Sequence, residues 1–469
     1  MTTGVTATRR LALSIGILAA VLCVGVSSAH AADYYVSTSG NNSNPGTQAQ
    51  PWRTVAYAVS NSSPVTAGDT IYVRGGVYAE YIVIGKSGSN NGPITLRPYQ
   101  TEQVALTTGG QLGNIMASGK CNWTIQGFEI RDSSGGGGIY WDGSNCSGTV
   151  SILNNVIHNT DSGDNASCVF LQRNLGTFIV ENNVLYDCDG TNPGNNTGIV
   201  VFGHINSGNP GSINLQIRNN EIYNEGVGIK IKHPFATDQN VAVDISYNLI
   251  RNVYHKGGIS VAGGKFTSTK VHRIHHNVIL NSSSSPGIEV GDDFDEWGVE
   301  IDHNTVYGTQ TSFTLCLADN CSNGGSRSIN LHDNIFVPVA RSGTAGYAIW
   351  TEVTSSPFTA ADYNCFWNQG SSTEVANWGG YGGGSADTFA EWQSRGFDLH
   401  SVRGNPMFVN AAGGDFRLQS GSPCKNLRGN GRDAGAYETG SEVIGPRAGT
   451  TPRAPTAPSN FRVLGTDGL

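Results

Sequence analysis

Basic residues are scarce in this chain, yet three of them lie within four consecutive positions. The stretch from residue 226 to residue 235 reads GVGIKIKHPF and contains Lys230, Lys232 and His233. The whole sequence has only 28 lysines and arginines among 469 residues. Side chains alternate between the two faces of a β-strand. We therefore expect both lysines on the outer face of one strand, with the isoleucines beside them pointing inward.

Such a pair of lysines suits the β-elimination of uronic acids. This reaction removes the proton beside the sugar carboxyl group and expels the glycosidic oxygen. A cation must neutralise the carboxylate and a base must take the proton. A lysine serves as a base when neighbouring positive charge lowers its pKa. We expect Lys232 as the base and Lys230 as the carboxylate clamp, or the reverse, with His233 as a third catalytic residue.

The neighbours of the two lysines follow from similar strands along the chain. Six strands align by their first residues: GIYWD, CVFLQ, GIVVF, GIKIK, GISVA and GIEVG. This alignment places Val200 and Phe202 on one side of the lysine pair, and Ser260 and Ala262 on the other. Neither neighbouring strand offers a carboxylate at these positions, so we expect the lysines to be unpaired within the sheet.

The same outer face carries residues suited to binding a sugar chain. Sugar rings stack on aromatic side chains, while hydroxyl and carboxyl groups need polar partners. We therefore expect substrate contacts from Tyr140, Phe170, Phe202, His204 and Glu289. The alternative is that these are ordinary surface residues and that the lysines only help solubility.

Two acidic loops are candidates for binding calcium. The segment YDCDGTN offers Asp187 and Asp189, and the segment GDDFDEW offers Asp292, Asp293 and Asp295. Clustered carboxylate and amide oxygens suit Ca²⁺. Neither loop is a complete EF-hand loop, and a solvated acidic turn is the alternative for each.

A repeat of about 30 residues positions these groups. Its marker is an asparagine flanked by aliphatic residues, as in ILNNVI and IHHNVI. The marker residues are Asn155, Asn183, Asn220, Asn248, Asn277, Asn304 and Asn334, with a degenerate Asn364. Such periods indicate a stacked architecture. Each period contains short Val/Ile-rich pieces split by Gly, Asn, Ser and Asp, so the pieces are strands and not helices.

We therefore predict an all-β fold, a right-handed parallel β-helix of about ten coils with three short strands per coil. The recurring asparagine takes a left-handed conformation at a bend, and its amide bonds to the next coil. Gly127, 28 residues before Asn155, extends the series. The segment TVAYAV, residues 54 to 59, is a short helix that caps the first coil.

The chain resembles the pectate-lyase-like β-helix superfamily of secreted bacterial proteins. The resemblance rests on DYYVSTSGNNSNPGTQAQPWRTVAYAV, on the asparagine-marked coils, and on GNPMFVNAAGGDFRLQSGSPC with DAGAYE near the end. It covers most of residues 33 to 438. The resemblance implies a polysaccharide lyase, a glycoside hydrolase, an epimerase or a non-catalytic binder, because one fold hosts several functions.

Lysine-based elimination is our leading hypothesis, and two alternatives stay open. GVGIKIK also resembles the basic strand of polygalacturonases, which implies a hydrolytic site at Asp161, Asp187, Asp189, His204, Lys230 and Lys232. However, Cys188 splits the paired aspartates, and no glycine follows His204. The third possibility is a carbohydrate-binding surface protein without catalytic activity.

The ends of the chain indicate export. Residues 1–32 read as a secretory signal peptide, with Arg9 and Arg10 before an apolar run. Residues 33–438 are the β-helix domain, and residues 439–469 read as a linker or tail rich in Pro, Thr and Gly. We expect a secreted monomer that acts on an acidic polysaccharide.

Charge and cysteine content agree with export. Removing residues 1–32 takes away two arginines and no acids, so the net charge goes from -8 to -10. An acidic balance argues against nucleic-acid binding. No other apolar stretch is long enough to span a membrane. Eight cysteines remain, and four disulfides are plausible on spacing: Cys121/Cys146, Cys168/Cys188, Cys316/Cys321 and Cys365/Cys424.

Overall fold

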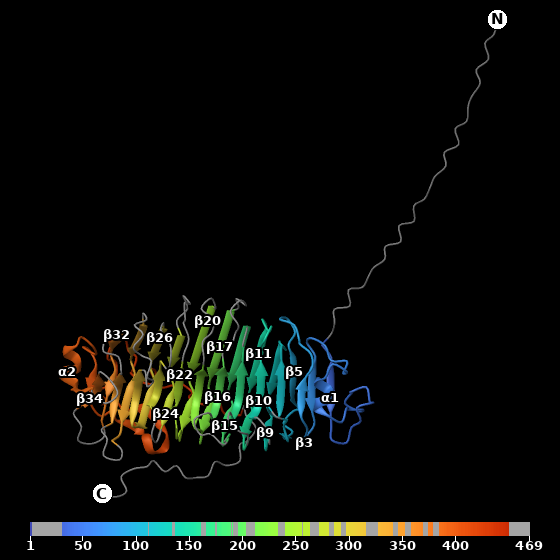
Figure 1. The fold of residues 1–469 in the computed structure, drawn as a ribbon, viewed down its shortest axis with the longest axis horizontal. Coiled ribbons are helices and arrows are strands. Elements are labelled where there is room, and N and C mark those ends of the chain that lie inside the picture. Colours follow the sequence, from blue (N-terminus) through green and yellow to red (C-terminus); the bar gives the residue numbers. More distant parts are fainter. Residues whose placement is uncertain are drawn as a thin grey trace.

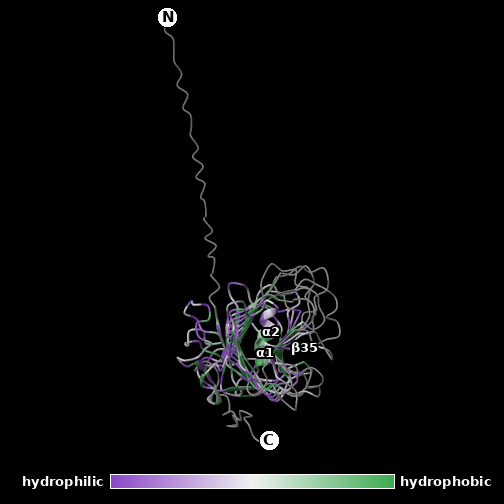
Figure 2. Cartoon of the chain, turned by 90° about the vertical axis from the view of Figure 1, so that its left-hand side faces the viewer, coloured by the Kyte–Doolittle hydropathy of each residue, from purple (hydrophilic) through white to green (hydrophobic). Residues whose placement is uncertain are grey.

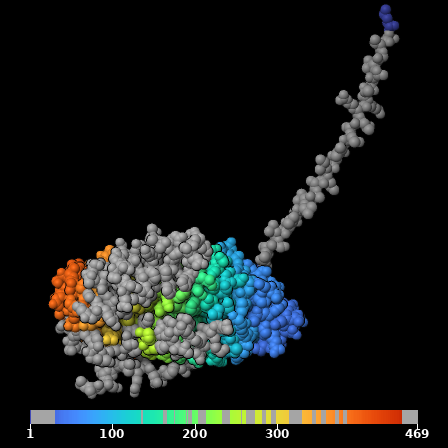
Figure 3. Space-filling view, in the orientation of Figure 1, coloured from blue at the N-terminus to red at the C-terminus, as the bar shows by residue number. Residues whose placement is uncertain are grey.

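The computed structural model of the chain contains one elongated solenoid (Figures 1 and 3). It describes residue 1 and residues 31–110, 112–133, 137–160, 166–173, 176–188, 190, 196–202, 212–232, 240–255, 257–262, 272–280, 286–291, 297–315, 327–340, 346–351, 358–368, 374–378 and 384–449. The first coils lie at one end of the body and the last coils at the other, as expected for a chain that winds in one direction.

Three sheets of twelve strands each run along the described part of the solenoid. Sheet A contains β1 (Asp33–Val36), β2 (Thr70–Val73), β5 (Ile94–Pro98), β8 (Trp123–Gln126), β11 (Thr149–Leu153), β14 (Gly176–Glu181), β17 (Ser212–Arg218), β20 (Asn240–Ser246), β23 (His272–His275), β26 (Trp297–Asp302), β29 (Arg327–His332) and β32 (Phe358–Asp362). Sheet B contains β3 (Gly76–Ala79), β6 (Val104–Thr107), β9 (Glu129–Arg131), β12 (Val156–His158), β15 (Val184–Tyr186), β18 (Glu221–Tyr223), β21 (Leu249–Arg251), β24 (Val278–Leu280), β27 (Thr305–Thr309), β30 (Ile335–Pro338), β33 (Cys365–Phe366) and β36 (Val402–Arg403). Sheet C contains β4 (Ile82–Ile84), β7 (Ile115–Ser118), β10 (Gly137–Asp142), β13 (Ser167–Gln172), β16 (Thr197–Phe202), β19 (Val227–Lys232), β22 (Ile259–Ala262), β25 (Pro286–Val290), β28 (Thr311–Leu315), β31 (Tyr347–Thr351), β34 (Glu374–Trp378) and β35 (Ser385–Thr388).

This arrangement confirms the predicted right-handed parallel β-helix, although the number of coils differs slightly from the ten predicted. Apart from the antiparallel β34–β35 pair at the end of sheet C, each strand of the three sheets pairs in parallel with the equivalent strand of the next coil, as β16 pairs with β19 and β19 with β22. Inward side chains stack in columns, and Ile199, Ile229, Ile259 and Ile288 are all at most 1% exposed. Because every coil alone leaves its apolar interior open, stacking supplies the core.

The predicted asparagine ladder is present between sheets A and B. Asn155, Asn183, Asn220, Asn248, Asn277, Asn304, Asn334 and Asn364 are all fully buried. Each amide nitrogen from Asn155 to Asn334 donates to the amide oxygen of the next ladder residue, at 2.9 to 3.2 Å. The ladder thus satisfies polar groups that the bend removes from the sheets.

The left-handed residue at the bend is the one before each ladder asparagine, so the prediction was off by one position. The residues with positive φ are Asn154, Asn182, Asn219, Tyr247, His276, His303, Asp333 and Tyr363. Gly127, with φ of 83°, belongs to this row. Phe128 takes the ladder position, because its backbone nitrogen donates to Asn155 Oδ1. We call these nine residues, Gly127 included, the left-handed row.

Short helices close both ends of the solenoid (Figure 2). The predicted cap is α1 (Val55–Val59), whose N-terminal Val55 and Ala56 backbone nitrogens donate to the Glu80 carboxylate. The other end is closed by α2 (Phe389–Ser394), which the sequence analysis did not predict. Its Trp392 is fully buried and donates through Nε1 to Asp398. Both helices cover apolar side chains that the end coils would otherwise expose.

The chain then returns along the outside of the solenoid. After β37 (Phe408–Asn410), the 3-10 helix η1 (Ala411–Gly413) and β38 (Asp415–Leu418), residues 424–449 lie against the left-handed row. We call this segment the strap. Arg428 binds Asp333, the backbone nitrogen of Gly445 donates to Tyr247 O, and Arg447 N donates to Asn182 Oδ1. Residues 439–449, which the sequence analysis placed in a linker or tail, thus bind the coils through backbone groups.

Three of the expected disulfides are present: Cys121–Cys146, Cys168–Cys188 and Cys365–Cys424. The fourth expected pair, Cys316/Cys321, lies outside the described residues. Disulfides agree with an oxidising compartment outside the cytoplasm. In the described residues, no helix is long and apolar enough to cross a membrane.

Candidate active site

A pocket of about 190 Å³ opens on the outer face of sheet C, over three consecutive strands. Strands β13, β16 and β19 supply its lining, which consists of Ser167, Phe170, Gln172, Thr197, Val200, Phe202, Lys230 and Lys232. The pocket therefore brings the two lysines together with two of the aromatic residues that the sequence analysis singled out. It is mixed in character, with an apolar floor and ammonium, amide and hydroxyl groups around it.

The register around the lysines is as predicted. Lys230 pairs with Val200 and Ser260, and Lys232 pairs with Phe202 on the preceding strand. The expected exposure is wrong for Lys230, which is only 5% exposed. Lys232 is half-buried, and its Nζ lies 5.8 Å from the ring centroid of Phe202. The two neighbouring amines thus have different surroundings.

The expectation that the lysines are unpaired is also wrong. Lys230 has interaction partners of its own. Lys232 has the Phe202 ring, whose face attracts a cation. The sequence analysis considered only carboxylates as partners. It therefore did not count the ring of Phe202, on the adjacent strand β16, as a partner of Lys232.

Aromatic side chains form a ladder that leads into the pocket. Tyr140 stacks on Phe170 with ring centroids 5.2 Å apart, and Phe170 lies 6.3 Å from Phe202. Tyr140 does not line the pocket, but its hydroxyl donates to Gln172 Oε1, which does. Burial, and then the charge of Asp142, raise the pKa of Tyr140, so this hydroxyl stays a proton donor. The ladder offers a surface on which sugar faces can stack.

Glu289 does not join the site as expected. Ser260 in β22 pairs with Lys230 on one side and with Glu289 in β25 on the other, so Glu289 is two strands away from Lys230. Glu289 is 6% exposed and accepts a hydrogen bond of 2.8 Å from Ser260 Oγ. It does not line the pocket. Glu289 thus supports sheet C through Ser260, and its contact with a substrate stays a prediction.

Two hydroxyl residues of the pocket, Ser167 and Thr197, were missed. Their oxygens lie 2.6 Å apart and both residues are buried. They pair at the first positions of β13 and β16. The alignment of the strand starts contained this signal, since a serine and a threonine stand one residue before CVFLQ and GIVVF. The analysis considered only the aliphatic and charged positions after them.

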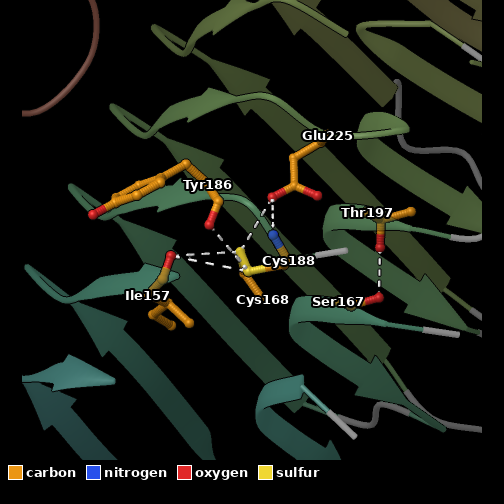
Figure 4. Close-up of a disulfide and its surroundings, with 7 residues drawn as sticks. All are labelled: Ile157, Ser167, Cys168, Tyr186, Cys188, Thr197 and Glu225. Atoms are coloured by element: carbon orange, nitrogen blue, oxygen red, sulfur yellow. Dashed lines mark hydrogen bonds between the residues drawn. A yellow bond between two sulfur atoms is a disulfide. The ribbon is translucent and has the colours of Figure 1, made fainter. Parts of the chain in front are cut away.

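A disulfide anchors this side of the pocket (Figure 4). Cys168, next to Ser167, is bonded to Cys188, which follows β15. Glu225 is fully buried, and its Oε1 accepts a 3.0 Å hydrogen bond from the Cys188 backbone nitrogen. These covalent and polar contacts join β13, which holds Phe170, to the turn before β19, which holds the two lysines. The pocket thus stands on a cross-linked part of the solenoid.

Asp187, a predicted calcium ligand, has a structural role at a bend. It is half-buried with φ of 51°, and its Oδ1 accepts a 3.0 Å hydrogen bond from Asn224 Nδ2. Asn224 and Asn252 have similar positive φ values at the equivalent bends of the next coils. None of the three groups of convergent His, Cys, Asp and Glu ligand atoms in the described part of the chain contains Asp187.

Several predicted site residues lie outside the described residues. They are His233 among the catalytic candidates, His204 among the substrate-binding candidates, and Asp189, Asp292, Asp293 and Asp295 among the calcium ligands; Asp161 of the hydrolase alternative is another. Their roles stay predictions.

Comparison with known proteins gives a consistent class. A family model described as "Pel9A-like, right handed beta helix region" matches residues 34–210. The uncharacterized protein YwoF of Bacillus subtilis is 24% identical over 84% of this chain and 92% of its own length. Pectate lyase PEL9 of Emericella nidulans is 42% identical over 16% of this chain and 18% of its own length. Pectate lyase L of Paenibacillus polymyxa is 34% identical over 28% of this chain and 30% of its own length.

Among solved structures, the complex of XylC with xylose resembles the chain with 13% identity and a TM-score of 0.44, over 71% of this chain and 83% of that chain. The sequence matches and the solenoid together define the class: this is a pectate-lyase-like right-handed parallel β-helix protein. Two of its sequence relatives are named as pectate lyases, and these matches span less than a third of those enzymes.

Proposed function

We propose that the protein is a secreted polysaccharide lyase that cleaves a uronic-acid-containing chain by β-elimination. The observation that carries this proposal is the pocket in which Lys230 and Lys232 stand at the end of an aromatic ladder. The similarity to two pectate lyases supports the same reaction class and favours pectate as the first substrate to test. Alginate and glucuronan offer the same carboxyl chemistry.

The surroundings of the two lysines favour Lys230 as the base and Lys232 as the carboxylate clamp. A clamp must carry a permanent charge, and the ring of Phe202 attracts the cationic form of Lys232. Lys230 is the more buried of the two. The buried Lys230 amine would take the proton beside the carboxyl group while Lys232 neutralises the charge that builds on it.

The hydroxyl pair and the aromatic ladder complete the proposed binding mode. Ser167 and Thr197 line the pocket with a pair of hydroxyl groups that are hydrogen-bonded to each other and give it a polar side next to a sugar. Phe170 and Phe202 offer their rings to its apolar face. Calcium would add a second cation at the carboxylate, held by the acidic loops that contain Asp187, Asp189, Asp292, Asp293 and Asp295. Of these five, only Asp187 is described, and its contact with Asn224 leaves the calcium site a prediction.

The proposal is tested by incubating the purified protein with pectate, alginate or glucuronan, each with added Ca²⁺ or with a chelator. Lyase action produces an unsaturated uronate, which absorbs ultraviolet light, together with new reducing ends. Reducing ends without that absorbance would indicate hydrolysis, and binding without either product would indicate a carbohydrate-binding protein. Loss of activity with the chelator and its return with Ca²⁺ would support the calcium prediction.

A further inference from the structure

A second cluster of titratable groups lies far from the pocket, between the left-handed row and the strap. His276 and His303 come from successive coils of that row, and their rings stack in parallel with centroids 5.0 Å apart. Glu438 of the strap faces both of them. Its Oε1 lies 3.6 Å from His276 Nε2, and its Oε2 lies 3.3 Å from His303 Nε2. The ligand atoms of the three residues all lie within 4.8 Å of one another.

Contacts around His303 engage its Nδ1 and leave its Nε2 facing Glu438. The Nδ1 of His303 lies 2.9 Å from Asp302 Oδ1. Asp302 is fully buried and also binds Arg273 through two bonds of 2.7 Å. Asp302 therefore holds the His303 ring from the side of Nδ1, within a network fixed by Arg273.

A parallel chain of contacts holds the ring of His276. The Nε2 of His275 lies 3.4 Å from Asp244 Oδ1. The Nδ1 of His275 lies 2.7 Å from His276 Nδ1. Because His276 is engaged at Nδ1, its Nε2 is the ring nitrogen that faces Glu438.

Both histidines thus direct Nε2 at the Glu438 carboxylate, so three potential metal-ligand atoms converge. His276 is 4% exposed, and its buried Nε2 has no hydrogen-bond partner. Glu438 Oε2 is also a buried oxygen without a hydrogen-bond partner. Arg432 donates to the other oxygen, Oε1, at 2.6 Å. Buried polar atoms without a hydrogen-bond partner are unfavourable unless an ion joins them.

We infer that His276, His303 and Glu438 bind a divalent transition-metal ion of the Zn²⁺ class. Two imidazole nitrogens and one carboxylate are a common zinc set, and the tetrahedral edge between such ligands is about 3.3 Å. The separations from the two Nε2 atoms, 3.6 Å to Oε1 and 3.3 Å to Oε2 of Glu438, are of that size, and one ligand atom from each residue lies within 4.8 Å of the other two. Asp302 and His275 would support the two ligands from behind, as metal-bound histidines usually require. His303 and Glu438 each retain 13% of their side-chain exposure, which leaves room for a water as the fourth ligand.

The two other clusters in the described part of the chain do not fit a metal. Cys168 and Cys188, which meet Glu225, are joined in a disulfide and have no thiolate to offer. In the group of His275, His276 and Asp302, the two histidine Nδ1 atoms are already hydrogen-bonded to each other.

The consequence of this site is a cross-link between the strap and two coils. Glu438 lies more than 130 residues after His303 in the sequence, so one ion would join the strap to the middle of the solenoid. This role is structural and independent of the lysine pocket. It would hold the strap where its neighbours bind Asn182, Tyr247 and Asp333.

The test uses the full secreted chain without a histidine tag, after treatment with a chelator. Titration with Zn²⁺ should show one tightly bound ion per chain. Glu438→Gln and His303→Ala should each weaken binding at least about 10-fold, the lower end of the loss when only a supporting residue is removed. His400→Ala is the control, because His400 pairs with Asp362 at the surface and is not part of the cluster. This variant should bind Zn²⁺ like the parent.

A second measurement separates metal binding from folding. Zn²⁺ should raise the Tm of the parent and slow its proteolysis within residues 439–449. In Glu438→Gln, Zn²⁺ should leave both the Tm and the rate of proteolysis unchanged. This variant keeps the shape of the side chain, so its Tm without metal serves as the check on folding. The inference is overturned if no Zn²⁺ binds to the parent, or if Glu438→Gln and His303→Ala bind it as tightly as His400→Ala does.

Discussion

At the scale of single residues, Lys230 and Lys232 show how one strand face can hold two different amines. Both side chains leave β19 on the same side, but Lys230 is buried beside Val200 and Ser260 while Lys232 reaches over the Phe202 ring. This difference in burial and partner, and not the spacing of the two residues, is the basis for separate roles.

Replacement of either lysine by methionine should lower kcat/KM by at least about 10²-fold, the low end for a positioned acid, base or electrostatic group. Methionine keeps most of the side-chain volume, which matters because Lys230 is buried. Arginine should retain more activity at position 232 than at position 230. It keeps the positive charge that the clamp needs, but it is a poor proton acceptor and cannot replace the base. The measurement is the initial rate of unsaturated product formation. Lys120→Met, at a half-buried lysine outside the pocket, should match the parent; equal activity in all variants would make the pair ordinary surface residues.

The ladder asparagines are a second residue-scale feature, and Asn248 tests them. Its Nδ2 donates to Ile217 O and to Asn277 Oδ1, both at 2.9 Å, while its Oδ1 accepts from the backbone and side chain of Asn220. Asn248→Ala leaves several buried groups unsatisfied, at about 1 to 3 kcal/mol each. We expect the free energy of unfolding to fall by at least about 2 kcal/mol.

Denaturant titration followed by circular dichroism measures this loss. Asn91→Ala is the matched control, since Asn91 is an exposed turn residue, and it should stay within about 0.5 kcal/mol of the parent. Equal midpoints for the two variants would show that the ladder contributes no stability.

At the scale of elements, the tight stacking of sheet C depends on glycines near the strand starts. A Cβ added at Gly228 in β19 would lie 2.3 Å from Gly258 O and 2.7 Å from Ile250 Cγ2. Gly298 in β26 has no atom within 4 Å of the same position. Neither glycine has a positive φ, so the difference between them is one of space alone.

Gly228→Ala should therefore destabilise the protein by about 1 to 3 kcal/mol, the usual cost of overpacking. It should also lower lyase activity, because β19 would shift where it holds Lys230. Gly298→Ala should change neither. Thermal unfolding and initial rates of the two variants measure these effects. An unchanged Tm for Gly228→Ala would contradict the close contact between β19 and the next coil.

At the scale of the whole molecule, the strap connects coils that are distant in sequence. Besides the contacts of Arg428 and Glu438, Asn219 Nδ2 donates to Val443 O at 2.9 Å, and Ile444 packs with buried residues of β24. The disulfide Cys365–Cys424 holds the start of the strap on a late coil. The strap therefore covers one edge of the solenoid from its C-terminal end toward the middle.

A chain that ends at Glu438 should be less stable than a chain that ends at Gly449. The shorter chain loses the hydrogen bonds of Val443, Gly445 and Arg447 and the partial burial of Ile444. At about 0.5 to 1.5 kcal/mol for each hydrogen bond, with the apolar area added, the loss is about 2 to 4 kcal/mol. Differential scanning calorimetry of the two chains measures it. The same Tm in both would mean that residues 439–449 add nothing to stability.

The sequence by itself determined the features that recur in every coil. The strand type, the strand register beside Lys230 and Lys232, the buried asparagines and the short helix after Thr54 all follow from local patterns that repeat about every 30 residues. Repetition lets one coil predict the next, because equivalent side chains stack on one another.

Only the tertiary structure decided the features that depend on a particular neighbour. The burial of Lys230, the ring beside Lys232 and the hydroxyl pair of Ser167 and Thr197 come from packing between coils. The meeting of Glu438 with His276 and His303 depends on a strap that returns across more than 130 residues. No periodicity encodes such a contact, since it is made once, between segments that are brought together only after the solenoid has formed.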